Sequence, residues 1–187
     1  INSDTTSWIL ISNVTFQRNI DSPITINSGL FKINDAGNFT VDNFRATEQQ
    51  FFGAQSSAIV IYRRCQGILR GIRIYNNNIS KPGSSPGYAF GYIYITRESN
   101  VTIEDTYIYD NYLSSQTHSS GAITVDSSAV TIMNSIFMNN TFITLNPNSP
   151  RASASLIHIE ASEVRVYNCT FLNNYLTNGA SILKSLF

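Results

Sequence analysis

The side chains with the clearest potential for chemistry are four carboxylates in the second half of the chain. Glu104 and Asp105 are adjacent, whereas Asp126 and Glu160 each end a short run of alternating apolar residues. Paired carboxylates can hydrolyse a glycosidic bond when they stand roughly 5–9.5 Å apart, and neighbouring carboxylates can also bind a cation. These residues, with Arg97 nearby, are therefore candidates for catalysis, although no motif assigns them a reaction.

Other patterns of catalytic or metal-binding residues are not found in this sequence. It contains no Ser–His–Asp arrangement, no P-loop and no zinc-ligand spacing, and its two histidines are His118 and His158. We expect no cofactor and no metal ion. The only basic cluster, for which a solvated face is the simplest interpretation, consists of Arg63, Arg64, Arg70 and Arg73.

Composition limits the possible partners. Of the 187 residues, 42% are apolar and only 13% are charged, with 12 basic residues balancing 12 acidic ones. A neutral chain lacks the electrostatic basis for binding nucleic acid, and no apolar run is long enough to span a bilayer. We expect a single domain over residues 1–187, as part of a longer solenoid or of a stacked assembly.

The elements that must position these side chains repeat along the sequence. Alternating apolar residues indicate strands, and six similar segments start 30, 28, 34, 29 and 34 residues apart. The aligned segments are 9–19, 39–49, 67–77, 101–111, 130–140 and 164–174. A shorter motif interleaves with them, so one repeat comprises about 31 residues with two or three strands. Loops are expected mainly at 78–90, 112–121 and 141–155.

The columns of this alignment predict the architecture. The third and eighth columns are largely apolar and should face inward; they contain Ile11, Val41, Leu69, Ile103, Ile132, Val166 and Phe16, Ala46, Ile74, Ile108, Phe137, Phe171. The eleventh column is mostly Asn, which can form a stacked amide ladder, and the fifth column is rich in Asn, which tolerates a left-handed corner. The sequence therefore predicts an all-β, right-handed parallel β-helix of about six coils.

Two short motifs add a resemblance to known proteins. F-x-x-N occurs at 16–19, 137–140 and 171–174, and small residues lead the segments SAIV (57–60) and GAIT (121–124). These repeats resemble those of the chlamydial polymorphic outer-membrane proteins and, more generally, the pectate-lyase-like right-handed β-helix superfamily. The resemblance implies the fold, and it implies that acidic residues could serve a lyase or glycosidase.

The register of the alignment also predicts which residues that are distant in the sequence lie close together and which do not. Cys65 and Cys169 should lie three coils apart, beyond the reach of a disulfide, because coils stack about 4.8 Å apart. Asp42, Arg70 and Glu104 should form a ladder of alternating charge on adjacent coils.

The surface residues suggest an extracellular setting. Six N-x-S/T sequons are candidate N-glycosylation sites, at Asn13, Asn38, Asn78, Asn100, Asn139 and Asn168. Tyrosines expected to point outward form a possible carbohydrate or partner surface; they are Tyr75, Tyr92, Tyr94, Tyr107 and Tyr109. We expect a secreted or cell-surface protein.

These observations favour a non-enzymatic structural or adhesive module. It would carry N-linked glycans and assemble end to end, with itself or with neighbouring solenoid segments, into fibres. The alternatives are a polysaccharide lyase or glycoside hydrolase that uses the four carboxylates, and a carbohydrate-binding module that uses the tyrosines.

Overall fold

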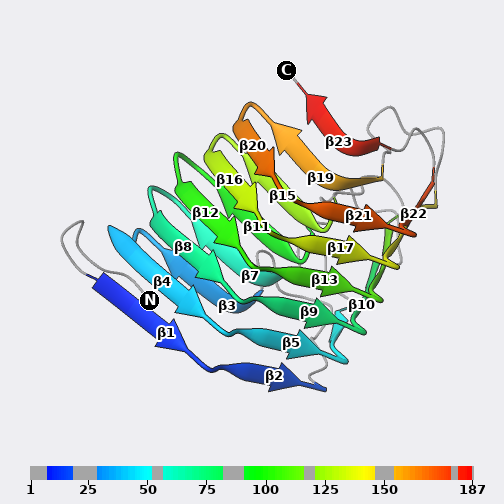
Figure 1. Cartoon of the computed structure of the whole chain (residues 1–187), viewed down its shortest axis with the longest axis horizontal. Helices are drawn as coiled ribbons and strands as arrows, with labels where there is room; N and C mark the ends of the chain where they lie inside the picture. The colour runs from blue at the N-terminus through cyan, green and yellow to red at the C-terminus, as the bar shows by residue number, and fades with distance from the viewer. Residues whose placement is uncertain are drawn as a thin grey trace.

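The strands wind into a parallel β-helix whose coils lie on top of one another, with β1 and β23 at opposite ends of the stack (Figure 1). Each complete coil contributes one strand to each of four sheets, named A to D in chain order. No helix in the described ranges is long and apolar enough to cross a bilayer. The computed structural model describes residues 8–18, 29–51, 57–81, 91–115, 121–145, 154–177 and 181–186.

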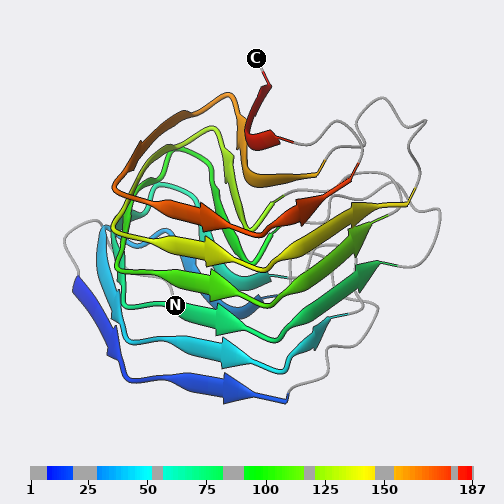
Figure 2. The ribbon, with the colours of Figure 1, turned by 45° about the vertical axis from the view of Figure 1, so that its right-hand side comes forward.

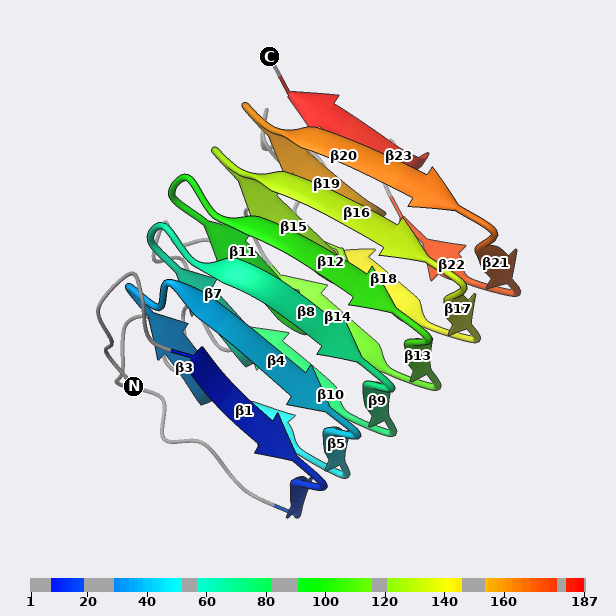
Figure 3. The same ribbon diagram turned by 60° about the vertical axis from the view of Figure 1, so that its left-hand side comes forward.

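All strand pairs in the four sheets are parallel, and Figures 2 and 3 show the coils from two further directions. Sheet A contains β1 (Trp8–Ser12), β4 (Asn38–Asp42), β8 (Gln66–Arg70), β12 (Asn100–Glu104), β16 (Ala129–Met133) and β20 (Glu163–Tyr167). Sheet B contains β2 (Thr15–Gln17), β5 (Arg45–Thr47), β9 (Arg73–Tyr75), β13 (Tyr107–Tyr109), β17 (Ile136–Met138) and β21 (Thr170–Leu172). Sheet C contains β6 (Gln50–Phe51), β10 (Asn78–Lys81), β14 (Tyr112–Ser115), β18 (Thr141–Thr144) and β22 (Tyr175–Leu176). Sheet D contains β3 (Gly29–Asn34), β7 (Ser57–Tyr62), β11 (Ile93–Thr96), β15 (Ile123–Asp126), β19 (Ser155–Glu160) and β23 (Ser181–Leu186).

The predicted apolar columns form the core. In sheet A, Ile103 pairs with Leu69 on one side and with Ile132 on the other, and all three are 0% exposed. In sheet B, Phe137 pairs with Phe171, and their rings stack with centroids 5.0 Å apart. Because side chains alternate along a strand, this register places every second residue inside the coil. The predicted parallel register and a period of about 30 residues are confirmed.

Sheet C corrects the predicted loops. Residues 78–81, 112–115 and 141–144 are strands, so a coil has four strands where two or three were expected. Each of these strands buries an inward side chain, namely Ile79, Leu113 or Phe142, at 1% exposure or less. The remainder of the three predicted loops lies partly outside the described residues.

Left-handed backbone turns the chain between sheets A and B. All six residues of the fifth column have positive φ, between 47° and 65°; they are Asn13, Asn43, Gly71, Asp105, Asn134 and Asn168. Asn and Asp tolerate this conformation because their short side chains can bond locally. Hydrogen bonding between coils continues through the corner, as when the Asn43 N–H donates to the Arg70 carbonyl at 3.0 Å.

The eleventh column forms a buried amide ladder at the end of sheet B. The backbone N–H of Asn77 donates to Oδ1 of Asn111 at 3.0 Å, and the backbone N–H of Asn140 donates to Oδ1 of Asn174 in the same way. Gln49 begins the described part of this ladder by donating its N–H to Asn77 Oδ1 at 2.9 Å. The ladder satisfies backbone donors that would otherwise be buried without a partner. Asn19, also predicted in this column, lies outside the described residues.

Small residues allow neighbouring coils to approach closely where sheet D begins. A Cβ atom on Gly121 would collide with the carbonyl oxygens of Ser155 and Leu156 on the next coil. The equivalent residues of the pairing register, Ser57 and Ser155, are both 0% exposed. This close approach explains the small-residue lead of the repeat.

Candidate functional site

The four candidate carboxylates lie at two separate corners. Asp126 and Glu160 pair in register at the ends of β15 and β19, as predicted. Glu104 and Asp105 lie at the other end of sheet A, where β12 turns toward sheet B. A five-residue strand separates these corners, a distance of about 16 Å. The structure therefore brings Asp126 next to Glu160 and does not bring all four together.

Hydroxyl groups surround the Asp126 carboxylate. Thr96 Oγ1 and Ser127 Oγ donate to its two oxygens, each at 2.8 Å, and the Tyr94 hydroxyl donates at 3.4 Å. Burial raises the pKa of Tyr94 to about 12, so this phenol remains a donor at neutral pH. The carboxylate is thus held in place by three donors from its own surroundings.

Arg97 lies at the same corner as Asp126, but its guanidinium is directed elsewhere. The Arg97 backbone N–H donates to the Asp126 carbonyl at 3.1 Å. Its guanidinium carbon lies 4.6 Å from the centroid of the Tyr62 ring, a cation–π contact. The corner therefore combines two carboxylates on adjacent coils with one arginine anchored on an aromatic ring.

Glu104 belongs to the predicted charge ladder. Arg70 donates from Nε and Nη2 to the two Asp42 oxygens at 2.7 and 2.9 Å, and its Nη1 lies 3.6 Å from Glu104 Oε1. The Arg70 hydrogen bonds lower the pKa of Asp42. The ladder is confirmed, and because Arg70 is about half exposed, solvent screens both pairs and their contribution to stability is small.

The predicted basic cluster divides between two corners. Arg63 and Arg64 follow β7 and approach Asp35, at 3.4 and 3.9 Å. Arg70 and Arg73 lie at the corner between sheets A and B. Within the described ranges, no group of three or more His, Cys, Asp or Glu side chains could hold a metal ion. His118 lies outside those ranges, and His158 lies on β19 with its side chain partly exposed.

The tyrosine surface contains one wrong prediction. Tyr92 is 0% exposed and points into the core, where its hydroxyl donates to the Tyr112 carbonyl at 2.8 Å. Tyr94 occupies an outward strand position but is only 7% exposed, packed against Val60 and Tyr62. Tyr92 cannot belong to a ligand surface, and Tyr94 presents little of its ring.

The remaining predicted tyrosines, Tyr75, Tyr107 and Tyr109, lie on the outer face of sheet B. The rings of Tyr75 and Tyr109 stack on each other with centroids 4.9 Å apart and an interplanar angle of 2°. Each ring thus covers one face of the other, which reduces the aromatic surface left for a sugar. Tyr107 is 40% exposed, and the Arg73 guanidinium carbon lies 5.7 Å from its ring centroid.

The sequon asparagines all reach the surface. Asn38 is partly exposed, and the other five are exposed: Asn13, Asn78, Asn100, Asn139 and Asn168. Asn13 and Asn168 would have been blocked if they faced inward, but they occupy the outer corner between sheets A and B. All six asparagines therefore lie on the outside of the coils.

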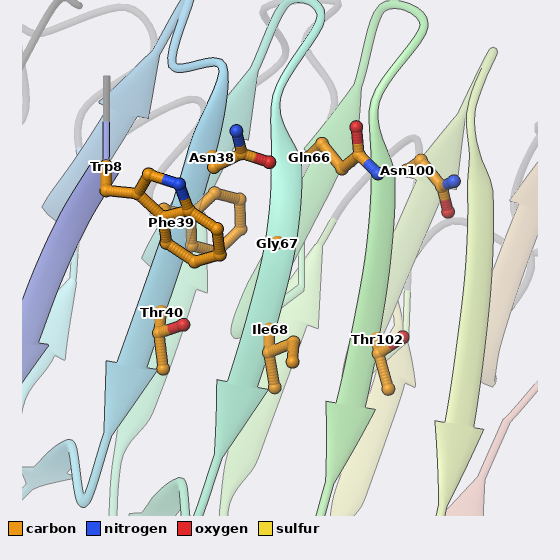
Figure 4. A pocket seen from close by; sticks show the side chains of 9 residues that line it. All are labelled: Trp8, Asn38, Phe39, Thr40, Gln66, Gly67, Ile68, Asn100 and Thr102. Carbon is orange, nitrogen blue, oxygen red and sulfur yellow. The ribbon is translucent and has the colours of Figure 1, made fainter. Parts of the chain in front are cut away.

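A shallow depression on the outer face of sheet A brings two of these sequons together (Figure 4). Its volume is about 220 Å³, and Asn38 and Asn100 lie along the same edge with Gln66 between them. Trp8 pairs in register with Asn38, and its side chain is 75% exposed. The depression is open, and its lining mixes amide and hydroxyl side chains with Trp8, Phe39 and Ile68.

A second inner ladder was missed in the sequence. Ala36 N–H contacts Cys65 Sγ at 3.5 Å, Cys65 N–H donates to Ser99 Oγ at 3.3 Å, and the pattern continues through Ser128 to Ser162. The signal was present, because Cys65, Ser99, Ser128 and Ser162 each precede an aligned segment by two residues. Burial raises the pKa of the Cys65 thiol. Cys65 thus has a structural role, and both it and Cys169 are free thiols, as predicted.

Comparison with known proteins supports the fold. The chain matches the family model described as a right handed beta helix region over residues 1–185. No curated protein and no solved structure matches it. The likeness to the polymorphic outer-membrane protein repeats stays a prediction. The family match and the stacked parallel coils agree, and the chain belongs to the right-handed β-helix family.

Proposed function

We propose that this chain is a structural or adhesive module of the cell surface or extracellular space, and that its end coils stack end to end on further copies or on neighbouring solenoid segments. The observation that carries the proposal is the exposure of apolar side chains in the last described coil. Ile132 and Phe137 are 0% exposed, whereas Val166 and Phe171, their register partners on the next coil, are only partly buried. The apolar columns therefore present uncovered surface at this end.

The first coil offers a matching surface. Ile11 and Phe16 belong to the same two columns and are also only partly buried. If the first coil of one copy lies on the last coil of another, both apolar columns continue without interruption. Unpaired strand edges favour such addition because they expose backbone donors and acceptors.

The extracellular setting rests on the six sequons. All six asparagines lie on the outside of the coils, where attached glycans would not disturb the core. Stacking would leave these outer faces free, so a fibre could carry a glycan coat. Peptide mass spectrometry of protein secreted from a eukaryotic host tests this part by identifying occupied sequons, and the absence of glycan from all six would contradict it.

Sedimentation velocity and electron microscopy test the stacking. We expect rods that lengthen as protein concentration rises. Phe171→Lys places a charge at the end of an apolar column and should abolish lengthening, whereas Leu172→Lys changes an outward side chain that is already 47% exposed and should not. Circular dichroism would verify that both variants fold. Single-length particles of the unmodified protein at every concentration would rule out stacking.

A second candidate, a polysaccharide lyase or glycoside hydrolase, is favoured by the corner that joins Asp126, Glu160 and Arg97. Neighbouring coils place the backbones of the two acidic residues about 4.8 Å apart along the stack, so their carboxyl groups can approach the roughly 5–5.5 Å separation used by retaining glycosidases. Release of reducing ends from a panel of polysaccharides would support this activity if Asp126→Asn abolished it. Activity that persists in all four single variants of Glu104, Asp105, Asp126 and Glu160 would exclude these carboxylates.

A further inference from the structure

Two arginines lie side by side and form no ion pair with a described carboxylate, whereas Arg97, which also forms none, contacts the Tyr62 ring. Arg45 and Arg73 pair in register on β5 and β9, and both are exposed. Five described arginines form ion pairs: Arg18, Arg63, Arg64, Arg70 and Arg165. No described carboxylate lies within the 4.0 Å ion-pair limit of Arg45 or Arg73. Like charges side by side on adjacent strands repel each other. A bound anion would reduce this repulsion.

A depression adjoins the two guanidinium groups. Its volume is about 350 Å³, and we name it the arginine notch; it is lined by Asn13, Thr15, Asn43, Phe44, Arg45, Gly71 and Arg73. No carboxylate lines it. Gly71 is the one residue of the fifth column without a side chain, and Asn43 Oδ1 lies 2.8 Å from where a Cβ would stand. The notch thus combines two cations with amide and hydroxyl groups.

The neighbouring surface shows why an anion would choose the notch. A second depression beyond Gly71 and Arg73 includes the carboxylates of Asp42 and Asp105. Asp42 is already bound by Arg70 at 2.7 Å. The arginine notch therefore lacks the carboxylates that accompany the arginines of the second depression.

We propose that the arginine notch binds a tetrahedral oxyanion, the sulfate or phosphate group of a modified polysaccharide. Each guanidinium presents a planar fork of hydrogen-bond donors that fits such an anion. Two guanidinium groups carry two positive charges, which is more than the single negative charge of a carboxylate. The contact of Arg73 with Tyr107 restrains one fork. Asn43 Nδ2 donates to Asn13 Oδ1 at 3.4 Å, which holds the two amides together at the rim. The proposal does not depend on end-to-end stacking.

Nuclear magnetic resonance of the arginine Nε–Hε groups tests the site directly. The protein should be made without N-glycans, because Asn13 heads a sequon and a glycan there would cover the rim. Sodium sulfate, sodium phosphate and sodium acetate would be titrated at constant ionic strength. We expect saturable shifts of Arg45 and Arg73 with sulfate or phosphate, and binding at least tenfold weaker in the Arg45→Gln, Arg73→Gln double variant. Arg165→Gln, a change to an exposed arginine paired with Glu163, is the matched control.

Heparin oligosaccharides, their desulfated forms and a phosphorylated dextran would separate the two sources of the oxyanion. Loss of binding to one modified polymer in the double variant, with binding retained in Arg165→Gln, assigns the notch to sulfate or to phosphate. Unchanged signals of Arg45 and Arg73, equal shifts with acetate, or equal binding by the double variant would each overturn the proposal.

Discussion

The side-chain amide of Asn111 donates to Oδ1 of Asn140, on the next coil, at 2.9 Å, and the two residues are 2% and 0% exposed. The same oxygen accepts the backbone N–H of Asn111 at 3.2 Å, and Asn111 Nδ2 also donates to the Ile74 carbonyl at 2.9 Å. The Asn111 side chain therefore bonds to both neighbouring coils and connects three successive coils. Because one Asn side chain can make all of these hydrogen bonds, the eleventh column of the alignment is mostly Asn.

Replacement of Asn111 by Ala should destabilise the fold. The change leaves the Asn77 N–H and the Ile74 carbonyl buried without their partners, each at a cost of about 1–3 kcal/mol. We expect the free energy of unfolding, measured with urea, to fall by about 2–4 kcal/mol. Gln66→Ala, which changes an exposed residue at the start of β8, is the control and should alter it by less than about 0.5 kcal/mol. Similar losses in the two variants would contradict a structural role for the ladder.

The left-handed corners predict a contrast between two substitutions at one position. Asn134 has φ 51° and is exposed. Asn134→Val should cost about 1–2 kcal/mol because a β-branched residue is strained in this conformation. Asn134→Gly should be tolerated, losing only the exposed hydrogen bond from Asn168. Thermal unfolding of both variants measures the difference, and equal melting temperatures would show that the corner imposes no such constraint.

Close packing at the start of sheet D predicts opposite effects of two changes to alanine. Gly121→Ala introduces a Cβ that collides with the Ser155 and Leu156 carbonyls, so we expect a loss of about 1–3 kcal/mol. Ser155→Ala removes a buried hydroxyl that lacks a hydrogen-bond partner among the described residues, and should be neutral or stabilising. Urea unfolding of the two variants provides the comparison, and a destabilising Ser155→Ala would indicate a partner for this hydroxyl.

Alkaline pH should weaken the fold through Tyr94. Its pKa is raised to about 12, chiefly by burial, whereas a tyrosine in the unfolded chain ionises near about 10. A raised pKa gives stability that is fully present below pH ~10 and is lost as pH rises toward ~12. The free energy of unfolding, measured between pH 8 and 11, should therefore fall less steeply in Tyr94→Phe. Tyr167→Phe, a change to an exposed residue, serves as control, and an unaltered slope in Tyr94→Phe would contradict the raised pKa.

The sequence was sufficient to predict the coils because the same physical requirement recurs in each one. Ile103 and Phe137 stand in columns where every coil must supply an inward side chain, and Asn111 stands where every coil must satisfy a buried donor. The strands of sheet C were not predicted because they are short and polar, and each buries few inward side chains. Ile79, for example, is one apolar residue in the segment NISK.

Single side chains were harder to place than columns. Tyr92 was expected outside because it alternates with Ile93, yet both residues point inward. Its ring fits because the equivalent residues of the neighbouring coils, Ala58 and Ala122, are small. Arg45 and Arg73 are 28 residues apart in the sequence. The alignment places both in its seventh column, but the basic cluster was defined by distance along the chain, as Arg63–Arg73, and the structure divides it.

The stacking of the coils has a mechanical consequence. Apart from its covalent links, each coil is held by hydrogen bonds to the coils above and below, so force applied through the chain ends would act on the terminal coils first. One coil of about 31 residues would release about 100 Å of extended chain as it detached. Under tension the molecule would lengthen in regular steps, and it would recover its length as the coils wound back onto the remaining stack.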